Sequence, residues 1–97
     1  MTLQELQEHR AQILELAEAS GATHVRIFGS TGRGEVGPGS DIGIVVDMEP
    51  GRRGLEYFTL RVDLEMALGR SVDLIIGNGS DSGQEPVRRI LQSAVPV

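Results

Sequence analysis

The chain has 97 residues and a formal net charge of −5 at pH 7, and 39% of its residues are hydrophobic. This length fits a single domain over residues 1–97 with a modest core, which is mainly aliphatic because the chain holds only one tyrosine and two phenylalanines. The absence of cysteine excludes disulfides, zinc-thiolate sites and thiol nucleophiles, and the absence of lysine excludes Walker-A loops, protein kinases and Schiff-base enzymes.

The first half of the chain predicts a helix, two strands and a glycine-rich turn between the strands. Apolar residues at helical spacing predict a helix over residues 3–19, and Gly21 is a suitable residue to end it. Residues 25–28, V-R-I-F, predict a short strand, and residues 29–34, G-S-T-G-R-G, are too rich in glycine to form core. Residues 35–39 are expected to form a loop, and residues 41–48 a second strand.

The second half predicts helices that alternate with strands. Residues 72–76, V-D-L-I-I, predict a third strand, Pro86 opens a short helix that reaches about Ser93, and residues 94–97 form a short edge strand. We therefore expect an α/β (α+β) domain with one small mixed sheet flanked by helices. A long helix is predicted over residues 55–68, with the apolar candidates Leu55, Phe58, Val62, Leu64, Met66 and Leu68.

The glycine-rich turn is a candidate anion site. Glycines allow backbone N–H groups to approach a phosphate closely, and the hydroxyl of Ser30 can donate a hydrogen bond to it. The spacing of Gly29, Gly32 and Gly34 gives G-x-x-G-x-G, which differs from the dinucleotide-binding pattern G-x-G-x-x-G. A tight turn without a ligand has the same composition, so that alternative stays open.

Two aspartates lie on neighbouring predicted strands. Asp41 begins the second strand, and Asp73 is the one carboxylate in an apolar third strand. Burying an unpaired charge costs several kcal/mol, so Asp73 requires a metal, an arginine such as Arg70 or Arg26, or a position open to solvent. Considered by itself, Asp41 is also consistent with an ordinary residue of a turn or of a strand's first position. Together with the turn, the two acids favour a metal–triphosphate site.

The run from Gly29 to Gly43 resembles the signature of the polymerase-beta-type nucleotidyltransferase superfamily. That signature commonly has G-S-x-x-R-G, then a spacer, then S-D-I-D. In length and along the whole chain, the sequence is similar to the minimal nucleotidyltransferase family, which implies a polymerase-beta-like nucleotidyltransferase fold. The residues that fit the signature are Gly29, Ser30, Arg33, Gly34, Ser40, Asp41 and Ile42.

The resemblance implies magnesium-dependent transfer of a nucleoside monophosphate from a nucleoside triphosphate, with pyrophosphate as the leaving group. Gly29 and Ser30 would hold the β- and γ-phosphates, and Asp41 would ligate Mg²⁺. Asp73 corresponds to the family's third carboxylate, which helps to bind metal and can activate the attacking hydroxyl. Arg33 would steady a phosphate or a neighbouring acid, or serve a structural role. Two ions about 3.5–4 Å apart would clamp the attacking and leaving oxygens.

The sequence departs from the family at position 43. Residues i and i+2 of a strand share a face, and the family places its second metal-bridging aspartate two residues after Asp41, where this chain has Gly43. Asp47 lies about 13 Å farther along the strand, and Glu35 could reach the site only if its loop folded back. Three hypotheses remain: a relative that binds without catalysis, an enzyme rescued by another ligand, and a substitution introduced into an active enzyme.

The resemblance also implies a partner. Members of the family are typically antitoxins paired with an all-helical HEPN-type toxin, and active members transfer AMP from ATP to a toxin tyrosine. Arg52–Arg53 and Arg88–Arg89 are candidate contact points. The alternatives are a catalytically inactive antitoxin or interaction protein that neutralises its partner by binding, and a nucleotide-binding regulatory module.

The acidic balance argues against a polynucleotide as the main partner, because dedicated nucleic-acid binders carry basic surfaces. No apolar run approaches the roughly 20 residues needed to cross a membrane. The N-terminal run M-T-L-Q-E-L-Q-E-H-R is acidic and amphipathic, unlike a signal peptide. We therefore expect a cytoplasmic protein.

Overall fold

A computed structural model describes residues 3–34, 41–79 and 85–97 of the chain. The expected loop over residues 35–39 lies outside these ranges, as does the match of Ser40 to the family signature. The described residues form a four-stranded sheet in the order β3-β2-β1-β4. β2 pairs in parallel with β3, whereas β1 is antiparallel to both β2 and β4, so the predicted mixed sheet is confirmed. The strands are β1 Ala22–Ile27, β2 Ile42–Met48, β3 Val72–Ile76 and β4 Val95–Pro96.

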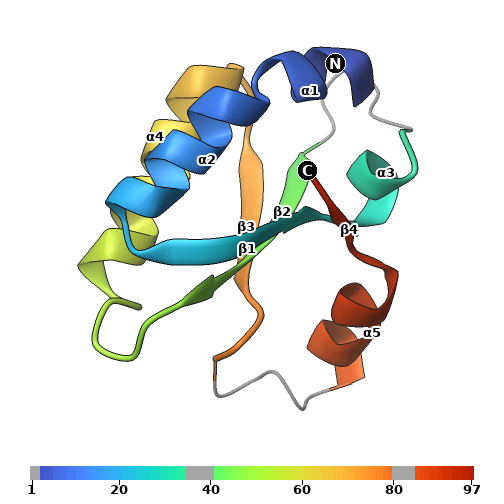
Figure 1. The fold of residues 1–97 in the computed structure, drawn as a ribbon. Helices are drawn as coiled ribbons and strands as arrows, with labels where there is room; N and C mark the ends of the chain where they lie inside the picture. Colours follow the sequence, from blue (N-terminus) through green and yellow to red (C-terminus); the bar gives the residue numbers. More distant parts are fainter. Residues whose placement is uncertain (1–2, 35–40, 80–84) are drawn as a thin grey trace.

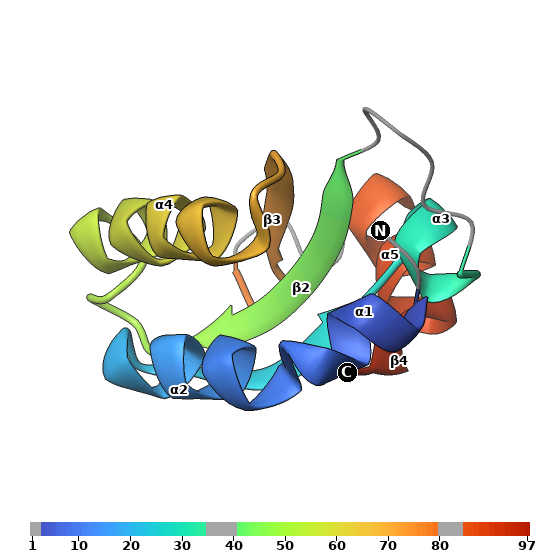
Figure 2. The ribbon, with the colours of Figure 1, turned by 90° about the horizontal axis from the view of Figure 1, so that it is seen from above.

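Helices lie on both sides of this sheet. Figures 1 and 2 show α2 and α4 together on one side of β2, with α3 and α5 on the other. None of the helices in the described ranges is both long and apolar enough to cross a membrane. The helices are α1 Leu3–Glu8, α2 Arg10–Ala19, α3 Gly29–Gly32, α4 Leu55–Leu68 and α5 Glu85–Ser93.

The central strand β2 separates the core from the site. Successive side chains of a strand point to opposite faces. One face of β2 belongs to the buried core cluster, to which α2 contributes Ile13 and α4 contributes Leu60 and Leu64. The other face carries Gly43, Val45 and Asp47, and it is the face that the predicted site occupies. The β2 residues of the core face are Ile42, Ile44, Val46 and Met48.

The N-terminal helix differs from its prediction. We expected one helix over residues 3–19, but a turn at His9 divides it into α1 and α2. His9 N–H donates to the carbonyl of Leu6 at 3.0 Å, an i to i−3 bond that tightens the chain and ends the first helix. The apolar spacing continues across the turn, because Leu6, Ile13 and Ala17 are all buried. The periodicity therefore could not show the break.

The bounds of α4 match the prediction, but its buried face does not. Leu60, Leu64 and Leu68 face the sheet. Four of the predicted apolar positions instead form a stripe on the opposite side of the helix, with Met66 78% exposed and Val62 51% exposed. The helix carries apolar residues on both sides, so periodicity alone could not choose the face that packs. The exposed stripe consists of Leu55, Phe58, Val62 and Met66.

Three strands begin at different residues than expected, β2 by a single residue, at Ile42 instead of Asp41. β1 begins at Ala22, three residues before the predicted strand, because the start of β1 pairs with the end of β2, where Ala22 lies opposite Met48. An irregularity in the register between Thr23 and Arg26 accompanies the left-handed backbone of His24, whose φ is 52°. The C-terminal edge strand is shorter than predicted and covers only Val95–Pro96.

Candidate functional site

The strand register brings the predicted acids together. Gly43 of β2 lies directly opposite Asp73 of β3, and Asp41 immediately precedes β2. With adjacent strands about 4.8 Å apart, the Cα atoms of Asp41 and Asp73 are separated by roughly 8 Å. A hollow of about 140 Å³ opens at this end of the sheet, and its lining residues are Phe28, Gly29, Thr31, Asp41, Gly43 and Asp73.

Both carboxylate residues are exposed, so solvent satisfies their charge and no buried ion pair is needed. The proposed pairing of Asp73 with Arg26 is wrong. The guanidinium of Arg26 instead binds Asp47, with Nη2 2.8 Å from Oδ1. Asp41 and Asp73 are thus both presented to the hollow rather than held in the fold.

The glycine-rich turn has regular secondary structure, because it contains the four-residue helix α3. The chain leaves β1 in an extended conformation at Phe28 and then takes a left-handed conformation at Gly29, where φ is 64°. A side chain is strained at that φ, which explains why glycine stands there. Gly29 therefore turns the chain sharply over the hollow that it lines.

Ser30 and Arg33 occupy the rest of this turn. Ser30 is the second residue of α3, and its side chain lies outside what the structure describes. Arg33 caps the C-terminus of α3, is exposed, and does not belong to the residues that line the hollow. The phosphate-binding roles of both residues remain predictions.

Thr31 contributes to the site although the sequence analysis did not select it. Its side chain is 1% exposed, and its Oγ1 accepts a hydrogen bond of 2.9 Å from the backbone N–H of Gly43. This bond ties α3 to β2 beside the hollow. A hydroxyl residue directly after Ser30 was the only available signal, and it does not reveal which strand the hydroxyl reaches.

Gly43 is enclosed by Phe28. The N–H of Phe28 donates to the carbonyl of Gly43 at 3.1 Å, and a Cβ atom at position 43 would lie 2.8 Å from the Phe28 carbonyl oxygen. The same Cβ would lie 3.2 Å from the Cε1 and Cε2 atoms of the Phe28 ring. An aspartate at this position would therefore cost folding free energy, since the backbone of Phe28 would have to shift.

Comparison with known proteins identifies the fold and the chemistry. A model of the nucleotidyltransferase domain matches residues 7–97 of the chain.

The chain belongs to the nucleotidyltransferase family. It is 37% identical over 84 residues to protein adenylyltransferase MntA of Thermococcus cleftensis. The matched region covers 86% of this chain and 85% of the relative. It is 33% identical over 92 residues to MJ0435 of Methanocaldococcus jannaschii, whose name also carries the words protein adenylyltransferase, covering 95% and 97% of the two chains. A solved structure described as a minimal nucleotidyltransferase superposes with a TM-score of 0.86 at 35% identity, covering 100% of this chain and 97% of that one.

Within residues 3–34, 41–79 and 85–97 of this nucleotidyltransferase, no side chain replaces the carboxylate that position 43 lacks. Asp47 shares the face, but its oxygens bind Arg26 and His24, the latter with 3.2 Å between Oδ2 and Nδ1. Glu35 lies outside the described residues. Among the residues that the structure describes, no three acidic or histidine side chains are close enough to share a metal. The two exposed carboxylates are hard oxygen donors that fit a single divalent cation with open coordination positions.

Proposed function

We propose that this nucleotidyltransferase transfers AMP from ATP to a hydroxyl group of a partner protein. One observation carries the proposal: Gly29, Asp41 and Asp73 line a single exposed hollow at the ends of two parallel strands. The relative from Thermococcus cleftensis, which is named a protein adenylyltransferase, supports ATP as the donor and protein as the acceptor.

In the reaction, the acceptor oxygen forms a bond to the α-phosphorus of ATP. The bond between that phosphorus and the oxygen bridging to the β-phosphorus breaks, and pyrophosphate leaves with the bonding pair. Asp73 is exposed in the hollow and takes the hydroxyl proton, and the turn at Gly29–Ser30 holds the β- and γ-phosphates. A Mg²⁺ ion held by Asp41 and Asp73 would neutralise charge on the triphosphate.

The partner in this proposal is an all-helical HEPN-type toxin, with this chain as the antitoxin in the cytoplasm. The resemblance to minimal nucleotidyltransferases supports that assignment. Of the arginines expected at the contact, Arg53 has a structural role. Its Nε donates to the carbonyl of Met48 at 3.1 Å and its Nη2 to the carbonyl of Asn78 at 2.8 Å. The exposed pair Arg88–Arg89 remains a candidate.

A second function is favoured by the packing at position 43. Position 43 lacks the second bridging carboxylate because it is glycine, and a Cβ atom there would lie 2.8 Å from the Phe28 carbonyl oxygen. An antitoxin that neutralises its partner by binding alone needs no such carboxylate. The two functions differ in whether AMP is transferred.

The test is transfer of labelled AMP from ATP to the helical protein encoded beside this chain. The matched variant is Asp73→Asn, which keeps the size of the side chain and removes its basicity. We expect slow transfer by the natural sequence and a loss of about a hundredfold in the variant, the usual contribution of a general base. Complex formation with no transfer by either protein would support the binding-only antitoxin.

A further inference from the structure

The edge of the sheet at β3 has outward-facing backbone groups. The carbonyl of Ser71 accepts from Ile42 N–H at 2.9 Å, and the N–H of Gly77 donates to the carbonyl of Val46 at 2.7 Å. Residues 71 and 77 therefore face β2, and so do the odd-numbered residues between them, because backbone groups alternate along a strand. Val72, Leu74 and Ile76 consequently direct their backbone groups away from the sheet.

Side chains of α4 satisfy only part of this edge. The Oε2 of Glu65 accepts from the N–H of Val72 at 2.9 Å, and the hydroxyl of Tyr57 donates to the carbonyl of Leu74 at 2.7 Å. Within the described ranges, the structure gives no hydrogen-bond partner to the outward N–H groups of Leu74 and Ile76. Two donors at alternate positions match the acceptors of an added strand.

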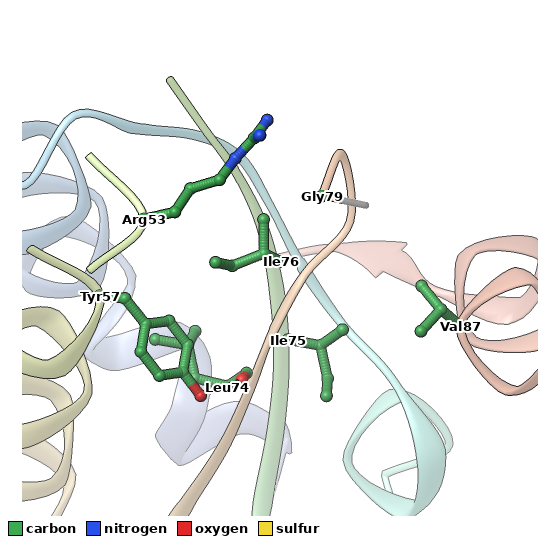
Figure 3. Close-up of a pocket in the computed structure, with 7 residues that line it drawn as sticks. All are labelled: Arg53, Tyr57, Leu74, Ile75, Ile76, Gly79 and Val87. Carbon is green, nitrogen blue, oxygen red and sulfur yellow. Dashed lines mark hydrogen bonds between the residues drawn. The ribbon is translucent and has the colours of Figure 1, made fainter. Parts of the chain in front are cut away.

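A hollow of about 330 Å³ lies along the same edge. Figure 3 shows Tyr57 on one side of β3, Ile75 and Val87 on the other, and Arg53 toward one end. The lining is mainly apolar, so it suits an aliphatic or aromatic side chain of the added segment.

Arg53 is the charged residue of this lining. Its two hydrogen bonds to the carbonyls of Met48 and Asn78 hold it in place, and Asn78 is itself fixed because its Oδ1 accepts from the N–H of Met48 at 2.9 Å. A held cation at the groove, in a chain of net charge −5, favours an acidic residue at that end of the bound segment.

We propose that the β3 edge binds an extended segment outside the helices of the acceptor protein as an added strand. This inference rests on the proposed function and specifies how the protein substrate is presented. β3 also carries Asp73, so a segment paired along it runs from the apolar hollow into the candidate active site. The distance from Ile75 to Asp73 corresponds to two residues of extended chain, about 7 Å.

The geometry gives the segment a pattern. An apolar residue enters the hollow beside Ile75, and a hydroxyl residue lies two positions away at Asp73. An acidic residue lies near Arg53, on the side of the apolar residue that is away from the hydroxyl residue. The backbone supplies affinity, while the apolar and acidic positions supply specificity.

The test begins with a displayed library of twelve-residue peptides, each with one fixed central tyrosine and random residues elsewhere. Selected peptides should carry the predicted pattern and should slow amide hydrogen exchange at Leu74 and Ile76. The diagnostic variant is Ile76→Pro, which removes the outward N–H at a strand edge where proline is tolerated. Loss of one such hydrogen bond should weaken binding about tenfold. Ile76→Val retains the N–H and should bind like the natural sequence.

A second variant covers the case in which Ile76→Pro does not fold. Val87→Glu adds a negative charge to the wall of the hollow without altering the backbone of β3, and Val87→Thr is its control. The glutamate should weaken peptide binding while ATP binding stays unchanged.

The inference is overturned if no peptide is selected, if the bound peptides leave both amides unprotected, or if binding survives the proline and glutamate variants. Peptides that bind this edge but never receive AMP would contradict the transferase proposal and leave the edge site intact. AMP transfer to peptides that leave the edge amides unprotected would overturn the edge site alone.

Discussion

Position 43 links packing to chemistry at the scale of a single residue. Gly43→Asp would supply the carboxylate opposite Asp73, and it would also place a Cβ atom 2.8 Å from the Phe28 carbonyl oxygen. We expect a rise in AMP transfer of at least about tenfold, because a second bridging acid is worth more than the 1.36 kcal/mol that a tenfold rate requires. We also expect a loss of about 1–3 kcal/mol in the free energy of unfolding, typical of overpacking.

Gly43→Ala separates these two effects. It adds the same Cβ atom without a carboxylate, so it should lose similar stability and gain no activity. Thermal unfolding and labelled-AMP transfer, measured on all three proteins, give both quantities. Equal transfer rates in the natural and aspartate proteins, both above background, would show that the assignment of metal ligands is wrong.

The residues of the site differ in how well the sequence predicted them. Gly29, Asp41 and Asp73 could be placed together because a signature names two of them and strand pairing brings the third alongside. Thr31 could not be found, since its role depends on the Gly43 N–H, 12 residues along the chain. The conflict at Gly43 was also invisible, because it arises from the path of the Phe28 backbone.

At the scale of elements, the orientation of α4 can be tested by comparing substitutions at one buried and one exposed residue of the helix. Leu60 is 0% exposed and Met66 is 78% exposed. Leu60→Ala should lower the free energy of unfolding by about 2–5 kcal/mol through lost burial and the cavity left behind. Met66→Ala should change it by less than about 0.5 kcal/mol. Chemical denaturation measures both, and similar losses would mean that α4 packs through its other face.

The link between α3 and β2 is a second element-scale feature that can be tested. Thr31→Val keeps the shape of the side chain and leaves the N–H of Gly43 without its acceptor. An unsatisfied buried donor costs about 1–3 kcal/mol, so the melting temperature should fall. Thr31→Ser retains the hydroxyl and should lose less. If valine is as stable as threonine, the bond to Gly43 does not hold α3 in place.

Element boundaries were predictable where a local signal marks them. Gly69 takes a left-handed conformation with φ of 68° and ends α4 at the predicted residue. The turn at His9 has no such marker, because the apolar spacing passes through it unbroken. The start of β1 depends on pairing with the far end of β2, which is a tertiary effect rather than a local one.

At the scale of the whole molecule, charge sets the class of partner. With a net charge of −5 and no lysine, the chain has no excess of cations to displace counterions from a polynucleotide. We expect no binding to a labelled single-stranded 20-mer of RNA or DNA at micromolar protein, measured by fluorescence anisotropy at low salt. Submicromolar binding that weakens with added salt would contradict this expectation.

Gly43, which lies opposite Asp73, also affects the stability of the cation-free protein. Like charges on directly paired residues of neighbouring strands repel each other, so two carboxylates at positions 43 and 73 would strain the metal-free sheet. With glycine at 43, that repulsion is absent, so an ion held by Asp41 and Asp73 stabilises the folded state less than one held by three carboxylates. A chelator should therefore lower the melting temperature of the natural chain less than that of Gly43→Asp, which should melt at a higher temperature when magnesium is added. The same position thereby decides how strongly the fold depends on the supply of divalent ions.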